Sequence, residues 1–137
     1  MDLVIGGYAN SKLSLVLDKL NNRDIKENII IINENNISEF LNPHKADEAL
    51  GQKTIVINHL HLIVKKLGYD KAAIFVEKCK RYSFDLVVIS DEIGNGIIPL
   101  QKEDRLYRDE VGRLLCELAK MSDNVERVIC GIVQKIK

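Results

Sequence analysis

Apolar residues gather in short, uninterrupted runs along the chain, and segments with helical periodicity lie between the runs. The four consecutive isoleucines at residues 29–32 are typical of a strand that is covered on both faces. Between the runs, apolar side chains recur three or four residues apart, as in amphipathic helices. The pattern predicts strands at residues 3–5, 29–32, 54–58 and 84–90, and helices at residues 12–20, 60–67, 72–82 and 104–121.

The remaining segments are less regular. Residues 35–43 are polar and carry at most a short helix, whereas residues 125–136 predict a final strand, or two strands broken at Gly131. Strands that alternate with helices, and that are apolar throughout, indicate an α/β fold with a parallel-core sheet and helices on both faces. No linker or repeat interrupts the pattern, so we expect a single domain over residues 1–137.

Parallel sheets bind ligands beyond the carboxyl ends of their strands. The positions of interest therefore come directly after the predicted strands. They include Asn33 and Asn58 as candidate nucleotide contacts, and Asp91 and Glu92 as candidate contacts to substrate or metal. For the two carboxylates, solvation at the surface is the alternative.

Charge and composition exclude several classes of function. Lys plus Arg and Asp plus Glu contribute 20 residues each, so the net charge is zero and no broad field attracts nucleic acid or an anionic membrane. No apolar run approaches the roughly 18 residues that span a bilayer, and the first residues lack the layout of a secretory signal. We therefore expect a cytoplasmic protein. Cys79, Cys116 and Cys130 suit neither a zinc motif nor a disulfide framework, and we expect buried free thiols.

A glycine-rich segment after the first predicted strand resembles the Walker A loop, GxxxxGK[ST], which joins a strand to a helix. In such loops backbone N–H groups wrap the phosphates, the lysine neutralises them and the hydroxyl holds Mg²⁺. A glycine turn before a helix that happens to begin with lysine is the alternative. The candidate nucleotide-binding residues of the loop are Gly6, Gly7, Tyr8, Ala9, Asn10, Ser11, Lys12 and Leu13.

Two positions of this loop differ from the Walker A pattern. Ser11 replaces the second glycine, so it has a Cβ atom where the loop can require a positive φ. Leu13 replaces the hydroxyl residue and has no atom that binds a cation. Ser14 is rotated by about 100° around the helix, so we expect it to point elsewhere.

The last third of the chain carries a more specific signal. It contains DEIGNGIIP at residues 91–99, RLYRD at 105–109, GR at 112–113 and GIVQKIK at 131–137. These segments resemble the [ND]-E-[VI]-G-x-G-[IL]-[VI]-P, R-x-[FY]-R-D-x-x-G-R and terminal G-I-P-x-x-I-K motifs of one family. It is the bifunctional adenosylcobinamide kinase / adenosylcobinamide-phosphate guanylyltransferase family of cobalamin biosynthesis. The first loop is also similar, since the family opens with G-G-x-x-S-G-K-S.

The resemblance implies a P-loop nucleotide-binding α/β fold, assembled as a homotrimer, with GTP or ATP and adenosylcobinamide as ligands. It also implies two reactions. A nucleoside triphosphate phosphorylates the aminopropanol hydroxyl of adenosylcobinamide, and GTP then transfers GMP to that phosphate through a guanylylated histidine. His44 is the candidate for that histidine, because it is the only histidine between the second and third predicted strands. A solvated loop histidine beside Pro43 is the alternative.

Several residues depart from the family pattern where chemistry is expected. Asn58 stands where the third strand usually ends in a carboxylate, and an amide adds no negative charge to a Mg²⁺ site. Together with Ser11 and Leu13, it predicts a degenerate active site in which Mg²⁺ has little role. His59 and His61 could bind a metal from one face of a strand. No third ligand lies near them in the sequence, so we assign no metal and expect packing or ligand contact.

The sequence therefore supports two hypotheses. The first is an adenosylcobinamide kinase / guanylyltransferase-like protein with impaired or lost catalysis, because each lost charge-stabilising contact lowers a rate by about a hundredfold or more. The second is a non-catalytic nucleotide- or corrinoid-binding subunit that regulates or assembles with other proteins. Both hypotheses expect a homotrimer or another homo-oligomer and no nucleic-acid or membrane partner.

Overall fold

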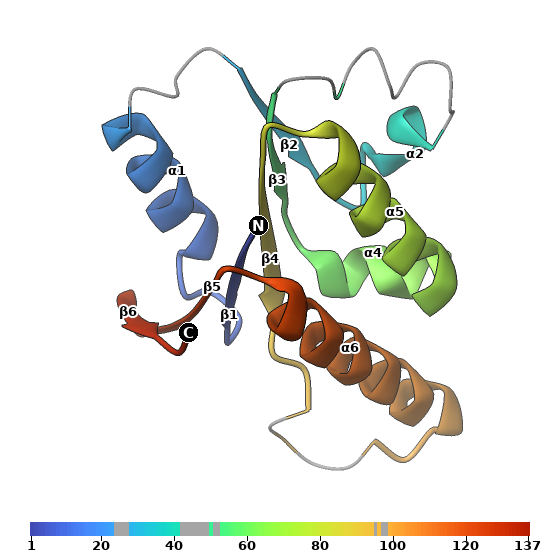
Figure 1. Ribbon diagram of the computed structural model, residues 1–137. Coiled ribbons are helices and arrows are strands. Elements are labelled where there is room, and N and C mark those ends of the chain that lie inside the picture. Colours follow the sequence, from blue (N-terminus) through green and yellow to red (C-terminus); the bar gives the residue numbers. More distant parts are fainter. Residues whose placement is uncertain (24–27, 42–49, 51–52, 95, 97–98) are drawn as a thin grey trace.

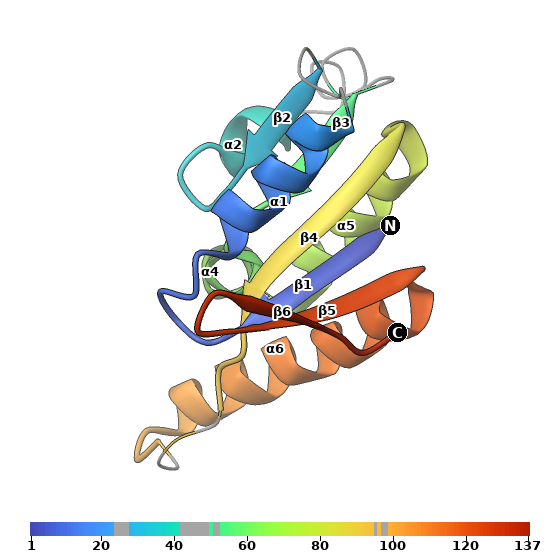
Figure 2. The same ribbon diagram turned by 90° about the vertical axis from the view of Figure 1, so that its left-hand side faces the viewer.

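A twisted six-stranded sheet with strand order β2-β3-β4-β1-β5-β6 runs through the molecule (Figures 1 and 2). The computed structural model describes residues 1–23, 28–41, 50, 53–94, 96 and 99–137. Strands β2, β3, β4, β1 and β5 are mutually parallel, and β6 pairs antiparallel with β5. The elements are β1 (Asp2–Gly6), α1 (Lys12–Asn22), β2 (Ile29–Ile32), α2 (Ile37–Phe40), β3 (Thr54–Ile57), α4 (Leu60–Leu67), α5 (Tyr69–Tyr82), β4 (Asp85–Asp91), α6 (Lys102–Met121), β5 (Asn124–Ile129) and β6 (Ile132–Lys135).

The five parallel strands send side chains into two apolar cores on opposite faces of the sheet. One core lies beneath α4, α5 and α6, and its strand residues include Leu3, Ile55 and Leu86. The other lies beneath α1, and its strand residues include Val4, Val56 and Val87. Figure 1 shows α1 on one side of the sheet and α4, α5 and α6 on the other. The predicted parallel-core α/β fold with helices on both faces is confirmed.

Strand β2 shows what its isoleucine run could not predict. Its side chains do enter both cores, but β2 lies at the edge of the sheet and only its last residue, Ile32, is fully buried. Central strand β4, in contrast, is buried from Leu86 through Asp91. A run of β-branched residues therefore indicates cover on both faces but does not give the position of a strand within its sheet.

The ends of several elements differ from their predicted positions. Helices α5 and α6 begin earlier than their apolar periodicity indicates, because their first turns are polar and contain Asp70 in α5 and Glu103 and Asp104 in α6. At the chain end, the two-strand alternative is correct, and β5 turns into β6 at Cys130 and Gly131, both with positive φ. Among the described residues, no helix is both long and apolar enough to cross a membrane.

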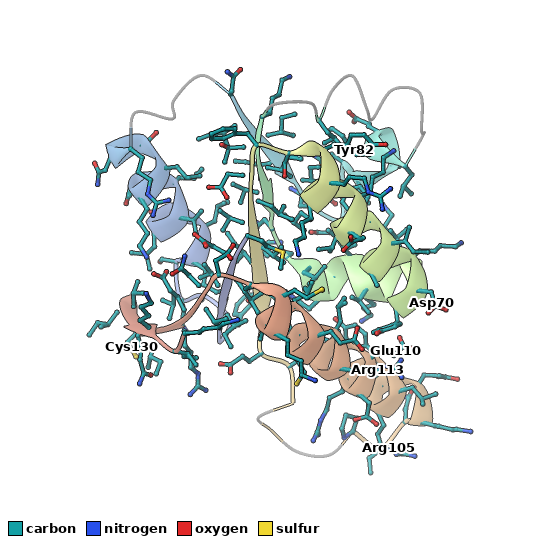
Figure 3. The ribbon with its side chains drawn as sticks, in the orientation of Figure 1. Asp70, Tyr82, Arg105, Glu110, Arg113 and Cys130 are labelled. Atoms are coloured by element: carbon teal, nitrogen blue, oxygen red, sulfur yellow. The ribbon has the colours of Figure 1, made fainter. Side chains whose placement is uncertain are left out.

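The prediction of buried thiols is correct for Cys79 and wrong for the other two cysteines. Cys79 packs in the core on α5, and this burial raises the pKa of its thiol to about 12. Cys116 is exposed on the outer side of α6, and Cys130 is exposed at the turn between β5 and β6 (Figure 3).

Gly6 ends β1 at a point where two backbones approach closely. A Cβ atom at this position would come within 2.4 Å of the carbonyl oxygen of Val128 on β5, and the backbone φ is 156°. Both features favour glycine, because it has no Cβ. The chain leaves the sheet here and enters the loop that leads to α1.

Candidate phosphate-binding site

The loop between β1 and α1 forms one wall of a hollow of about 360 Å³ at the carboxyl edge of the sheet. Residues directly after β3 and at the end of β4 complete the hollow, because β4 lies next to β1, β3 lies next to β4, and all three strands end at the same edge. The lining residues are Tyr8, Ala9, Asn10, Ser11, Lys12, Leu13, Ser14, Asn58, His59 and Asp91. Most of the candidate nucleotide contacts thus lie around one space, as the sheet rule predicts.

The loop has the backbone conformation that the sequence suggested. Ser11 has φ 53° and ψ 27°, and Ala9 also has a positive φ of 58°. The left-handed conformation costs an L-residue about 1–2 kcal/mol, so both residues hold strain. Ser11 is the N-cap of α1, but its side chain makes no capping hydrogen bond. The first N–H groups of α1 therefore find no acceptor in the Ser11 side chain and can donate to an anion.

Lys12 and Asp91 form an ion pair at the base of the hollow. Lys12 Nζ lies 2.6 Å from Asp91 Oδ1, with side-chain exposures of 6% and 12%. The same ammonium donates a hydrogen bond of 2.7 Å to the Gly7 carbonyl oxygen, which closes the loop on itself. Asp91 is thus buried and paired, so the alternative of a solvated surface carboxylate is wrong for it.

His61 holds Asp91 from the other side. The Asp91 N–H donates to His61 Nδ1 at 3.1 Å, and His61 Nε2 lies 3.6 Å from Asp91 Oδ2. Burial lowers the pKa of His61 below its usual 6.5, Lys12 and His59 act in the same direction, and Asp91 and Glu34 oppose them. A neutral ring with the proton on Nε2 satisfies both contacts.

Helix α6 contacts the backbone of His61. Tyr107 donates a hydrogen bond of 2.8 Å from its hydroxyl to the carbonyl oxygen of His61. Burial, with a smaller contribution from Asp91, raises the pKa of Tyr107 to about 12, so the hydroxyl keeps its proton. Farther along, the Arg113 guanidinium lies 4.1 Å from the ring centroid of Tyr69 and joins α6 to α5 (Figure 3).

His59 and His61 do not share the face of a strand, because β3 ends at Ile57. His59 is instead the N-cap of α4, in the left-handed conformation with φ 56° and ψ 47°, and His61 belongs to the first turn of α4. Their ring centroids are 5.8 Å apart. Across the described residues, no cluster of three histidine, cysteine or acidic side chains is placed to hold a metal ion.

Glu34 is a member of the site that the sequence did not single out. Its Oε2 lies 3.3 Å from His59 Nδ1, and both atoms are shielded from solvent. Glu34 comes shortly after β2, so the rule that ligands gather beyond strand ends could have included it. No pattern in the sequence links Glu34 to His59, because the two residues follow different strands.

The donor atoms of the hollow do not fit a Mg²⁺ ion held by the protein. Leu13 is apolar, Asn58 offers only an amide, and the Asp91 carboxylate is already engaged by Lys12. Magnesium is usually held through one or two carboxylates together with substrate phosphates. Ser14 is also among the residues that line the hollow. It stands one residue beyond the Walker A hydroxyl position.

The other candidate residues lie outside this hollow. Asn33 forms a local turn after β2, where its backbone N–H donates to Asn36 Oδ1 at 2.8 Å and its Oδ1 accepts from the Asn35 N–H at 2.9 Å. Glu92 accepts a hydrogen bond of 2.9 Å from Arg127 Nε, so it is paired rather than merely solvated. His44 lies outside the described residues.

The parallel sheet, with a glycine-rich loop running from its central strand β1 into α1 and a lysine at the helix start, defines an α/β protein with a P-loop-like core. The family model for cobinamide kinase / cobinamide phosphate guanyltransferase matches residues 20–136. The chain therefore belongs to this family. The match begins after the phosphate loop, so family membership rests on the rest of the sheet and its helices.

Two curated proteins are similar to part of the chain. The bifunctional adenosylcobalamin biosynthesis protein CobU of Salmonella typhimurium is 37% identical over 68 residues, which are 50% of this chain. The protein of the same name from Escherichia coli is 36% identical over 62 residues, or 45% of this chain. The alignments cover 38% and 34% of these two relatives, so the chain matches little more than a third of their length.

Proposed function

We propose that the chain is a nucleotide-binding protein of cobalamin biosynthesis that resembles adenosylcobinamide kinase / guanylyltransferases but has impaired transfer activity. The observation that carries this proposal is the hollow in which the loop, Lys12 and the ends of β3 and β4 meet, in a member of this family. Uncapped N–H groups at the start of α1 and the ammonium of Lys12 suit a phosphate group. GTP or ATP would bind there, and adenosylcobinamide would be the second ligand.

Impaired transfer follows from the two groups that the hollow lacks. In P-loop enzymes the hydroxyl after the lysine and a strand-end carboxylate help to hold the Mg²⁺ that bridges the β- and γ-phosphates. Leu13 and Asn58 stand at these positions. Without that ion, the charge that develops during phosphoryl transfer loses its main stabilising partner.

A second candidate function is a non-catalytic nucleotide- or corrinoid-binding subunit. The closed contacts of Lys12 with Asp91 and Gly7 favour it, because a phosphate must compete with groups that already satisfy the ammonium. Such a chain would bind ligand and respond to it without turnover.

Calorimetric titration with GTP, ATP and adenosylcobinamide, each with and without Mg²⁺, tests these proposals. We expect wild-type nucleotide binding to improve by less than about tenfold, or about 1.4 kcal/mol, when Mg²⁺ is added. The double variant Leu13→Ser with Asn58→Asp restores both missing groups and should respond more strongly to Mg²⁺. Strong Mg²⁺ dependence in the wild type, or cobinamide turnover at an ordinary enzymatic rate, would contradict the degenerate site.

Two finer proposals come from the resemblance. His44 is the candidate to carry the guanylyl group, so GTP labelled at the α-phosphorus should label the wild type and not His44→Asn. The chain is also proposed to assemble as a homotrimer or another homo-oligomer. Sedimentation that shows only a 15.5 kDa species at micromolar concentration would contradict assembly.

A further inference from the structure

His59 is held in a backbone conformation that histidine seldom adopts. Its φ of 56° and ψ of 47° place it in the left-handed region, which is strained for a residue with a side chain. Its carbonyl oxygen accepts hydrogen bonds from the N–H groups of Leu62 at 2.9 Å and Ile63 at 3.2 Å, so the first turn of α4 fixes the residue. His59 is thereby held in the wall of the hollow.

The Glu34 carboxylate lies beside one of the two ring nitrogens of His59. Nδ1 lies 3.3 Å from Glu34 Oε2, within ion-pair distance, and neither atom makes a hydrogen bond in the described structure. Both atoms are shielded from water, so the stable arrangement has a proton on Nδ1 directed at the carboxylate. Nε2 is left for another partner, and the side chain of His59 remains 44% exposed.

His61 cannot take this role, although it is chemically identical. Its Nδ1 accepts the Asp91 N–H, and its Nε2 faces the Asp91 carboxylate. The Asp91 carboxylate is in turn neutralised by Lys12. Among the described residues that line the hollow, His59 is therefore the base whose second nitrogen has no partner.

The charges around His59 come from several elements. The Glu34 carboxylate, after β2, lies beside Nδ1, and the amino end of α4 carries a partial positive charge. Lys12 of α1 and Asp91 of β4 largely cancel as an ion pair, and His61 is a neighbouring neutral ring. Lys66 of α4 is exposed and donates to the Glu34 carbonyl oxygen at 2.6 Å, where solvent screens its charge.

We propose that His59 is a proton-linked phosphate ligand, whose Nε2 takes up a proton from solvent and donates it in a hydrogen bond to a phosphate oxygen of the bound nucleotide. This inference rests on the proposed nucleotide-binding function. In the imidazolium form both ring nitrogens are donors, so Nδ1–H keeps its contact with Glu34 while Nε2–H reaches the phosphate. Glu34 is the positioning residue of the pair.

The proton supplies positive charge that the site does not obtain from a metal. Lys12 shares its charge with Asp91, and neither Leu13 nor Asn58 recruits Mg²⁺. A phosphate favours the protonated ring, and the protonated ring favours the phosphate by the same factor, since coupling between two binding events is reciprocal. Nucleotide binding should therefore take up a proton.

Calorimetry in buffers of different ionisation enthalpy measures this proton directly. ATP and GTP are titrated near neutral pH, with a chelator in place of Mg²⁺, into the wild type and His59→Asn. Asparagine tolerates the left-handed conformation, so the variant should fold. We expect the wild type to take up a fraction of a proton per nucleotide that His59→Asn does not. Affinity should fall by about tenfold in the variant, because one charge-assisted hydrogen bond is lost.

A matched pair of glutamate variants tests the positioning role. Glu34→Gln should reduce both the proton uptake and the affinity, whereas Glu39→Gln, at an exposed position on α2, should change neither. Melting curves of each variant check that it is folded. Equal proton uptake and affinity in the wild type and folded His59→Asn would overturn the inference but leave the proposed function intact. Absence of nucleotide binding by the folded wild type would overturn both.

Discussion

At the residue scale, Lys12 and Asp91 control the charge of the hollow. Each side chain is almost closed to solvent, so the attraction between them has to offset the loss of hydration of both charges. Removal of one partner therefore lowers the free energy of unfolding by more than the intact pair adds to it, because the other charge stays buried without a partner. A phosphate bound on the loop would be a second counter-charge for the same ammonium.

Replacement of Asp91 by Asn should expose this competition. We expect the free energy of unfolding to fall by about 3 kcal/mol, since the Lys12 charge loses its buried partner. ATP should recover part of the loss, so its stabilising effect in urea unfolding should be larger than in the wild type. Glu92→Gln, next in the chain, should cost less than about 1 kcal/mol, because its pair with Arg127 is partly exposed. If Asp91→Asn and Glu92→Gln lower the free energy of unfolding equally, the burial of Lys12 does not determine the loss.

Ser11 offers a second test of a single residue. Glycine adopts its left-handed backbone at little cost, so Ser11→Gly should raise the free energy of unfolding by about 0.5–1 kcal/mol. Ser14→Gly is the matched control, because the same change within α1 should lower stability by about 1 kcal/mol. Denaturant unfolding of both variants measures the difference, and a loss of stability in Ser11→Gly would contradict strain at this residue.

At the scale of elements, the close approach of β1 and β5 sets where the phosphate loop begins. The Val128 carbonyl group would stand 2.4 Å from a Cβ on Gly6, and sheet pairing prevents either backbone from moving aside. The loop can leave the sheet at this point because the last residue of β1 has no side chain.

Gly6→Ala should therefore destabilise the protein by more than about 2 kcal/mol, since overpacking against backbone cannot be relieved by a change of rotamer. Gly112→Ala is the control, because nothing lies within 4 Å of its added methyl group on α6. That change should stabilise the helix by up to about 1 kcal/mol. In urea unfolding, Gly6→Ala should lower the free energy of unfolding and Gly112→Ala should raise it. If Gly6→Ala is tolerated, β1 and β5 can move apart.

The elements could be predicted from the sequence where side-chain chemistry alone decides them. Apolar runs and helical spacing depend on burial, so the α/β alternation was recognisable. The edge position of β2 was not, because Ile29–Ile32 contact both cores there as they would in a central strand. The loop and Asn58 could be placed at the site by their strand ends. The contact of Glu34 with His59 could not, since it depends on how two loops meet above the sheet.

At the scale of the whole molecule, stability should depend on pH through His61. Its lowered pKa means that the folded protein binds this proton less readily than the unfolded chain. The contribution is fully present above the unfolded-state value of 6.5 and is lost as the pH falls through the lower folded-state value. Urea midpoints should decline from about pH 7 to about pH 5, and His61→Asn should decline less. Identical slopes would show that other groups carry the dependence.

The two faces of the sheet carry unequal layers, and this asymmetry affects where the molecule opens. In the part of the chain that the structure describes, α1 is the helix that covers one face, through residues such as Val16 and Leu20, whereas α4, α5 and α6 cover the other (Figure 1). Opening α1 exposes less apolar surface than opening the opposite layer, so its amide hydrogens should exchange with deuterium sooner. The phosphate loop runs directly into this weaker layer. A nucleotide that binds the loop would therefore slow hydrogen exchange first in α1. The free energy of binding would add to the free energy needed to open this one helix.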